Sequence, residues 1–486
     1  MHAGCSNLLP SQAPRAQAGT SNVSTELWRL PAHRLASLIA QREVSSREVV
    51  QAHLERIAAV NPQVNAITLA LGESALAAAD AADRNARNTG NGPLHGVPFS
   101  IKENLDLVGT ATTNGVPAFA HAMPTSDSPV VARMKAAGAI PLARTNLPEM
   151  GLRLSTNNPL RGRTLNPWNP ALTSGGSSGG CAVALATGMS PFSLGNDIGG
   201  SLRNPAYCCG IAALKPTQGR IPHAGSLPPQ DGGMAVQLML VEGPMARSVA
   251  DLRLGLSILA GADRRDPISV DVPLQGAPAP ARAALVTRFW GKPLPAATLA
   301  AIRAAGKALA EAGWEVEEVE PPELERVQEL WGRVLSVDFT QTLPQIRGLI
   351  TPELHANLDQ VCRHFDPATM PNLVLHAERS RLMRAWSGFF AQWPLAVGPT
   401  WGELPWPVDA DIDPVHGLEL LLSTWRFISP GNVLGIPSVA LPTGVADGLP
   451  TGVQIYADRW REDLCLNAAE IIEATLPGPA PIDPRG

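Results

Sequence analysis

Cysteine is scarce in this chain, and the few cysteines present lack metal-binding spacing. The 486 residues include 6 cysteines and no pair of C-x-x-C arms, so neither a disulfide scaffold nor a zinc site is predicted. We expect these cysteines to be buried free thiols in a reducing compartment. His95, His121 and His223 each stand alone in the sequence, and we therefore expect no metal or other cofactor.

Long apolar runs and basic clusters are missing as well. No uninterrupted apolar stretch approaches the roughly 18 residues that a membrane span needs. The net charge of −5, without a basic run, gives no footprint for nucleic acid. The G-x-x-x-x-G-K-[ST] motif of a phosphate-binding loop is also absent. We expect a cytoplasmic monomer or homodimer that acts on a small molecule, with no nucleic acid and no membrane as partner.

Composition predicts a tail followed by one large domain. Residues 1–26 are rich in Ser, Ala, Pro and Gln and contain no apolar core of a signal peptide, so we expect a disordered tail there. Residues 27–486 are interpreted as one domain, because 45% hydrophobic and 17% charged residues are ample for an extensive core. The proline-containing stretch 273–283 is interpreted as a surface loop within this domain.

Helix and strand signals alternate along the chain. A capping box at residues 45–48 (SSRE) opens a helix that is predicted to reach about Ile57. Further helices are predicted at 126–137 and 299–312, each followed by a strand, at 139–143 and 314–319. This alternation predicts an α/β fold in which helices cover both faces of a sheet.

One lysine follows a buried strand. Residues 96–101 (GVPFSI) predict a short buried strand that carries Lys102 inward at its end. An ordinary lysine at this position would reach back to solvent. A lysine acts as a base only when it is neutral, and lowering its pKa from ~10.4 to about 7 or 8 takes ~4 kcal/mol. In this sequence, burial at the end of the strand is what would lower the pKa of Lys102.

Two glycine-rich serine segments follow that lysine. Residues 175–180 (GGSSGG) lead into a predicted helix of small residues at 181–187, and a strand at 191–195 comes next. The loop 196–200 (NDIGG) contains glycines that let backbone N–H groups converge, and Ser201 stands where another helix opens. Such a position favours a developing oxyanion, so a nucleophile is expected at Ser201.

GGSSGG, DIGGS-x-R and the upstream lysine together resemble the amidase signature family over about residues 96–220. The resemblance implies a single large domain with a mixed, many-stranded sheet, and hydrolysis of amide C–N bonds. It gives Ser201 the role of nucleophile, Lys102 that of base, and Ser177, after a cis peptide bond, that of the bridge between them. The oxyanion donors would be the backbone N–H groups of Ile198, Gly199, Gly200 and Ser201. The supporting residues would be Ser178, Asn196, Asp197 and Arg203.

Two positions depart from the common form of the family pattern. Asn196 stands where threonine is usual, and Cys181 stands where serine, alanine or glutamate often occurs. We expect neither residue to touch the triad.

Two other functions stay open at this point. Residues 175–179 also satisfy the G-x-S-x-G pattern of α/β-hydrolases, which would make Ser177 the nucleophile, with His416 and one of Asp409, Asp411 and Asp413 as partners. That pattern should follow a buried strand, whereas residues 166–170 (NPWNP) are rich in turn formers. The chain also resembles the glutaminase-like subunit of a tRNA-dependent amidotransferase, which would need partner subunits.

Substrate choice is expected outside the shared motifs, in the variable segment 324–406. That segment is rich in tryptophan, which favours an apolar pocket and a neutral, fairly hydrophobic amide, aryl or alkyl. Carbamates (urethanes) and esters present the same carbonyl chemistry and stay open as substrates. The predicted pocket residues are Met150, Gly151, Trp386, Trp393, Trp401 and Trp406.

Overall fold

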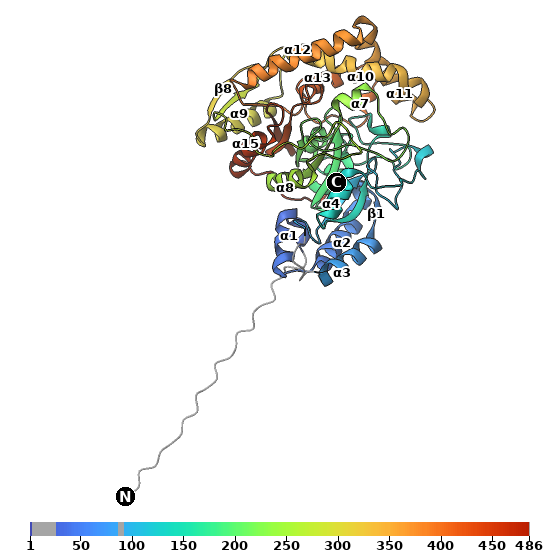
Figure 1. Cartoon of the computed structure of the whole chain (residues 1–486), viewed down its shortest axis with the longest axis vertical. Helices are drawn as coiled ribbons and strands as arrows, with labels where there is room; N and C mark the ends of the chain where they lie inside the picture. Colours follow the sequence, from blue (N-terminus) through green and yellow to red (C-terminus); the bar gives the residue numbers. More distant parts are fainter. Residues whose placement is uncertain (2–25, 86–91, 486) are drawn as a thin grey trace.

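One mixed sheet organises the chain (Figure 1). The computed structural model describes residue 1 and residues 26–85 and 92–485, so the predicted tail lies almost entirely outside the described residues. Eleven described strands pair in the order β1-β3-β2-β4-β6-β5-β10-β11-β9-β7-β8. The strands are β1 (Ile67–Ala70), β2 (Pro98–Lys102), β3 (Ile140–Thr145), β4 (Phe192–Asp197), β5 (Ala212–Lys215), β6 (Val241–Ala246), β7 (Arg282–Leu285), β8 (Glu315–Glu318), β9 (Leu395–Gly398), β10 (Ser438–Ala446) and β11 (Leu449–Tyr456).

Helices cover both faces of this sheet, as predicted. They are α1 (Ala32–Gln41), α2 (Ser46–Val64), α3 (Gly72–Asn85), α4 (Pro129–Ala136), α5 (Gly179–Ala186), α6 (Arg203–Cys209), α7 (Met234–Met239), α8 (Val249–Leu259), α9 (Ala296–Glu311), α10 (Leu324–Ile346), α11 (Pro352–His364), α12 (Asn372–Phe390), α13 (Gly417–Trp425), α14 (Ser429–Val433) and α15 (Glu462–Thr475). One apolar core holds side chains of α5, α6, α10 and α14, and a second holds those of α1, α4, α8, α9 and α15. Helices α10 to α13 gather at one end of the molecule (Figure 1).

The predicted elements form close to their expected places. The capping box is present at Ser45, whose side chain accepts from the Glu48 backbone, but α2 runs on to Val64 instead of ending near Ile57. Its last two turns stay helical because Val60 and Val64 are buried in the core. The helix–strand pairs α4–β3 and α9–β8 form as predicted.

The sheet brings the serine loops to the lysine. All of β2 is buried, and it runs parallel to β4. Since neighbouring parallel strands end at the same edge of a sheet, Lys102 at the end of β2 meets the loop that follows Asp197 at the end of β4. Ser177, just before α5 and 75 positions from Lys102 in the chain, also contacts this lysine.

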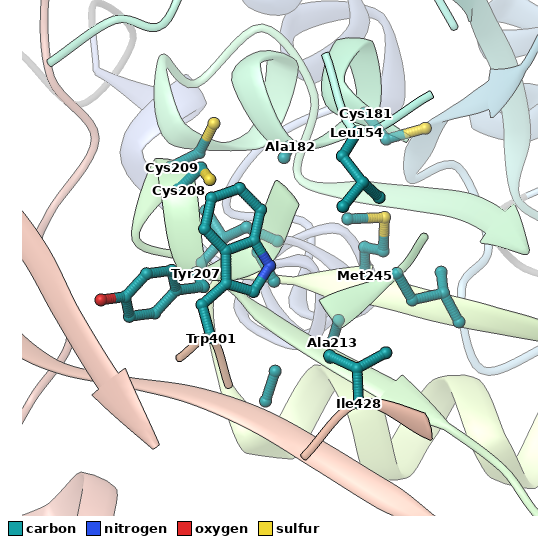
Figure 2. Packing of buried hydrophobic residues seen from close by; sticks show 14 of the residues in the cluster. Leu154, Cys181, Ala182, Tyr207, Cys208, Cys209, Ala213, Met245, Trp401 and Ile428 are labelled. Carbon is teal, nitrogen blue, oxygen red and sulfur yellow. The ribbon is translucent and has the colours of Figure 1, made fainter. Parts of the chain in front are cut away.

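Small residues allow the two helices beside this edge to pack closely. Every residue of α5 and α6 is buried. Figure 2 shows Cys181 and Ala182 of α5 in the same core as Tyr207, Cys208 and Cys209 of α6. The described cysteines are free, and all are buried except Cys362, which is half-buried. Cys5 lies outside the described residues.

Across residues 26–85 and 92–485, no helix combines the length and apolar character needed to cross a membrane. The same ranges hold no group of three or more His, Cys, Asp or Glu side chains arranged for a metal ion.

A buried ion pair should contribute strongly to stability. Arg220 and Glu462 lie 2.8 Å apart with both side chains 1% exposed. Because Glu462→Ala leaves the guanidinium buried without its partner, we expect a loss of about 3–5 kcal/mol in the free energy of unfolding. The urea midpoint by circular dichroism measures this. Glu315→Ala, which breaks the exposed pair with Arg282, is the matched control and should cost under about 1 kcal/mol; equal losses would contradict the prediction.

Candidate active site

Lys102 and Ser177 are in direct contact in the folded chain. Lys102 is fully buried, and its Nζ lies 2.7 Å from Ser177 Oγ and 2.7 Å from Asn196 Oδ1. The peptide bond between Gly176 and Ser177 is cis. No acidic side chain in the described part of the chain pairs with this lysine.

The burial of Lys102 changes its acidity in the direction that base catalysis requires. Desolvation lowers the pKa of Lys102 to about 8, against smaller opposing effects of Cys181, Glu242 and Asp197. At pH 7, roughly a tenth of this lysine would therefore be deprotonated, compared with well under a hundredth of an ordinary lysine.

Ser201 stands at the start of a loop-to-helix junction with free backbone donors. It is 6% exposed and lines a narrow cavity. Its carbonyl accepts from the Ser178 N–H at 3.2 Å, which joins the two serine loops, while Ser201 Oγ makes no hydrogen bond within the described ranges. The N–H groups of Ile198, Gly199 and Ser201 likewise donate to no described residue. These three N–H groups are thus available to an oxyanion.

The fourth predicted donor is already engaged. The Gly200 N–H donates to Asp197 Oδ1 at 2.8 Å, and the Leu202 N–H donates to Asp197 Oδ2 at 3.1 Å. By accepting these two hydrogen bonds, the buried Asp197 carboxylate fixes the conformation of the loop around Ser201.

Arg203 holds Asp197 in turn. Its guanidinium donates to both carboxylate oxygens at 3.0 Å, and Asn432 on α14 donates to Oδ1 at 2.9 Å. Although burial alone would raise the pKa of Asp197, the charge and hydrogen bonds of Arg203 hold it well below the ordinary value. Further bonds from Arg203 to Gln454 and Tyr456 tie the loop to β11.

One expectation about the departures from the family pattern was wrong. Asn196 touches the triad directly, because its side-chain oxygen accepts from Lys102 Nζ. A short amide at the end of β4 reaches the lysine, since β2 and β4 are neighbours. Cys181 bonds instead with Thr145 Oγ1 at 2.9 Å. Ser178 Oγ is buried and has no partner among the described residues.

The cavity beside Ser201 is apolar and aromatic. Its walls come from α10, α11 and α13 and from the segment after Pro148. Trp331 and Trp425 pack against each other with ring centroids 4.7 Å apart. The apolar and aromatic side chains in its wall are Leu152, Leu154, Ile198, Trp331, Leu335, Phe339, Leu358, Val361, Leu421 and Trp425.

The four tryptophans that were predicted to line the pocket do not line this cavity. Trp386 donates to the Pro322 carbonyl, and Trp393 stacks under the Arg282 guanidinium. Trp401 stacks on Trp406 at 4.3 Å and packs near Tyr207 (Figure 2). These large side chains serve the core, as tryptophans usually do.

Trp401 nevertheless supports the site indirectly, since its Nε1 donates to Asn204 Oδ1 at 2.5 Å, and Asn204 donates to the Gly199 carbonyl. Gly151 forms part of the cavity wall, whereas Met150 does not line the cavity and packs against the apolar cluster that includes Leu358. Gly151 has φ +72°, and a Cβ there would lie 3.3 Å from Ser177 Oγ.

The two tryptophans that do line the cavity, Trp331 and Trp425, were not among the predicted pocket residues, although Trp331 was one of the tryptophans for which the segment 324–406 was chosen. Trp331 Nε1 donates to the Ile198 carbonyl at 3.0 Å, and its ring lies where a Cβ on Gly199 would be 2.8 Å away. Trp331 belongs to the tryptophan-rich segment, but nothing in the sequence distinguishes it from its neighbours there. Trp425 lies beyond that segment, and only the packing of α13 on α10 brings it to the site.

The histidine-assisted alternative is not supported by the geometry. The His416 side chain is 78% exposed and lies 3.5 Å from Asp413. Ser177 Oγ contacts Lys102, and no histidine among the described residues bonds with it. The described residues therefore place no Ser-His-Asp arrangement at Ser177.

The chain resembles known amide hydrolases over most of its length. The Amidase family model matches residues 48–466. Indoleacetamide hydrolase of Bradyrhizobium diazoefficiens is 41% identical over 456 residues, which cover 92% of this chain and 86% of that protein. A glutamyl-tRNA(Gln) amidotransferase subunit of Salinispora arenicola is 32% identical, covering 93% of this chain and 98% of that one.

Solved structures agree with these relatives. A bacterial aryl acylamidase of the amidase signature enzymes superposes with a TM-score of 0.78 at 26% identity, covering 92% of this chain and 96% of that chain. The fold, the relatives and the family match lead to the same conclusion. This chain belongs to the amidase signature family and is an amidase-type hydrolase.

Proposed function

We propose that this enzyme hydrolyses small neutral amides with an aromatic or otherwise apolar acyl group, through an acyl-enzyme on Ser201. The observation that supports this most directly is the cavity beside Ser201, in which Trp331 and Trp425 form an aromatic wall. Apolar pockets with a few convergent polar groups favour neutral, hydrophobic ligands. The indoleacetamide hydrolase relative, whose named substrate carries an indole, is consistent with this class.

The charged side chains of the cavity neutralise each other. Arg153 donates to both oxygens of Asp411, at 3.2 and 2.9 Å, and also to Asp409 at 2.6 Å. The Arg153 and Asp411 side chains are both buried. A carboxylate on the substrate would therefore find no free cation among the described residues of this cavity, and burying it unpaired would be costly.

In the proposed reaction, neutral Lys102 takes the Ser177 hydroxyl proton while Ser177 takes that of Ser201. Ser201 Oγ then forms a bond to the amide carbon, and the free N–H groups of Ile198, Gly199 and Ser201 donate to the oxyanion. The relay returns its proton to the leaving nitrogen as the C–N bond breaks. Water attacks the acyl-enzyme by the same route and releases the carboxylic acid.

The glutaminase-like alternative receives less support from the cavity. Glutamine carries both an ammonium and a carboxylate, so its recognition needs a free acid and a free base. Arg153 and Asp411 instead bond to each other. The other polar side chains of this cavity are Ser201 and Asn357, whose amide donates to the Asp411 carbonyl at 2.9 Å, and neither carries a charge that would pair with glutamine.

Substrate charge should decide turnover. We expect kcat/KM for 4-methylphenylacetamide to exceed that for 4-carboxyphenylacetamide at least about 100-fold, because the carboxylate would be buried unpaired. Steady-state kinetics with the two amides measure this ratio of kcat/KM values, and indole-3-acetamide and glutamine are assayed for comparison. Asp411→Asn, which frees part of the Arg153 charge, should narrow the ratio. A preference of the wild type for the acidic member would refute the proposal.

Covalent labelling should identify Ser201 as the nucleophile, and the kinetics of a Lys102 variant should test that residue as the base. A fluorophosphonate should form one adduct, on Ser201, which peptide mapping by mass spectrometry locates and which Ser201→Ala removes. Lys102→Ala should lower kcat on amides about 10³-fold, since amine departure needs the returned proton. Lys135→Ala, at an exposed lysine, is the control and should change neither result. An adduct on Ser177 would contradict the assignment.

The pH profile should follow the buried lysine. Because Lys102 is active in its neutral form and burial lowers its pKa to about 8, kcat/KM should rise with pH through about 8 and level off above it. Initial rates on a neutral amide between about pH 6 and 10 measure the profile. A single rise centred near ~6.5, where an ordinary histidine titrates, would argue against a lysine base.

A further inference from the structure

A buried acid next to the base takes no part in the reaction described above. Glu242 on β6 is 2% exposed and is the direct cross-strand partner of Asn196 on β4. Directly opposed residues of an antiparallel pair point to the same face of the sheet, so the Glu242 side chain lies beside that of Asn196. Asn196 Oδ1 is the acceptor of the Lys102 ammonium at 2.7 Å.

The hydrogen bonding of Glu242 is incomplete. Its Oε1 lies 2.6 Å from His223 Nδ1, while its buried Oε2 has no partner among the described residues. Asn104, whose Nδ2 donates to Asn196 Oδ1 at 3.4 Å, also has a buried Oδ1 without a partner in the described part of the chain. An unsatisfied buried carboxylate oxygen makes the free energy of folding less favourable. Glu242 therefore lowers the stability of the fold at a position beside the proposed base.

His223 connects this acid to solvent. Its ring is 38% exposed and lines a second cavity, which shares no described residue with the cavity at Ser201. Its backbone N–H donates to Asp266 at 2.9 Å. Burial lowers the pKa of His223, but the hydrogen bond and charge of Glu242, together with Asp266 and Asp106, raise it above its ordinary value. His223 therefore keeps its positive charge to a higher pH than a free histidine.

Besides Glu242, the groups whose charges act on the pKa of Lys102 are Cys181 on α5 and Asp197 on β4. Two further charged groups lie next to its backbone: Arg144 on β3 donates to the Lys102 carbonyl at 3.4 Å, and Glu103 pairs with Arg161. Burial raises the pKa of the Cys181 thiol, which stays neutral, and the Asp197 charge is matched by Arg203. Glu242 is left as the acid whose charge acts on Lys102, and His223 is its counter-charge.

We propose that Glu242 and His223 act as a positioning pair for the base: the carboxylate beside Asn196 stabilises the protonated form of Lys102, and His223 offsets that effect. The pair adjusts the pH at which the enzyme becomes active, in addition to the larger effect of the burial of Lys102. This inference rests on the proposed role of Lys102 in the reaction.

The test uses two variants that should act in opposite directions. Glu242→Gln removes the charge that stabilises the Lys102 ammonium, so the acid limb of kcat/KM should move to lower pH by about one unit. His223→Gln removes the counter-charge, so the limb should move to higher pH by about half a unit. His33→Gln, which breaks the comparable pair with Asp251 between α1 and α8, is the matched control and should leave the limb in place.

A second measurement follows the titration of Lys102 in the absence of substrate. The lysines of the chain are Lys102, Lys135, Lys215, Lys292 and Lys307, so ¹³C labelling at lysine Cε gives few NMR signals, and the loss of one in Lys102→Met assigns the base. Its titration should shift in the same opposite directions in the two variants.

The outcomes separate the two proposals. If wild type hydrolyses no neutral amide, the proposed function fails, and the NMR titration still decides whether the pair acts on Lys102. If Lys102 titrates as in wild type in both variants, or moves in one direction in both, the positioning pair is refuted while the proposed function stands.

Discussion

The site depends on a lysine that is buried without an acid to pair with among the described residues. The neighbours of Lys102 are the neutral oxygens of Ser177 and Asn196. An adjacent carboxylate would hold the ammonium charged, whereas burial among neutral acceptors favours the free amine. Arg203 on α6 is equally buried but bonds to Asp197 and stays charged. Lys102 and Arg203 are thus two buried basic side chains with opposite roles.

That charged pair gives the oxyanion loop its shape. Asp197 accepts from two backbone N–H groups of the loop, and Arg203 anchors it to β11 through Gln454 and Tyr456. Because both groups are buried and fully bonded to each other, the loop is held in advance of substrate binding. Three N–H groups beside Ser201 remain free for the reaction within the described part of the chain, which is the preorganised arrangement that oxyanion stabilisation requires.

The substrate cavity is built from a different part of the chain than the chemistry. Strands β2 and β4 and the loops beside them carry the proposed triad, while α10, α11 and α13 supply the cavity wall. Trp331 connects the two parts, since its ring lines the cavity and its Nε1 donates to the Ile198 carbonyl of the oxyanion loop. Substrate size and the geometry of the loop are therefore physically coupled through one indole.

Local sequence determined the elements that hold the site. The buried strand before Lys102, the glycines that permit the loops, and the helix start at Ser201 depend on short-range sterics and capping, and each formed close to where it was predicted. The contact of Asn196 with Lys102, the Glu242–His223 pair and the choice of Trp331 and Trp425 over other tryptophans were decided only by tertiary structure. These depend on which strands become neighbours and how distant helices pack, and no periodicity within a segment encodes that.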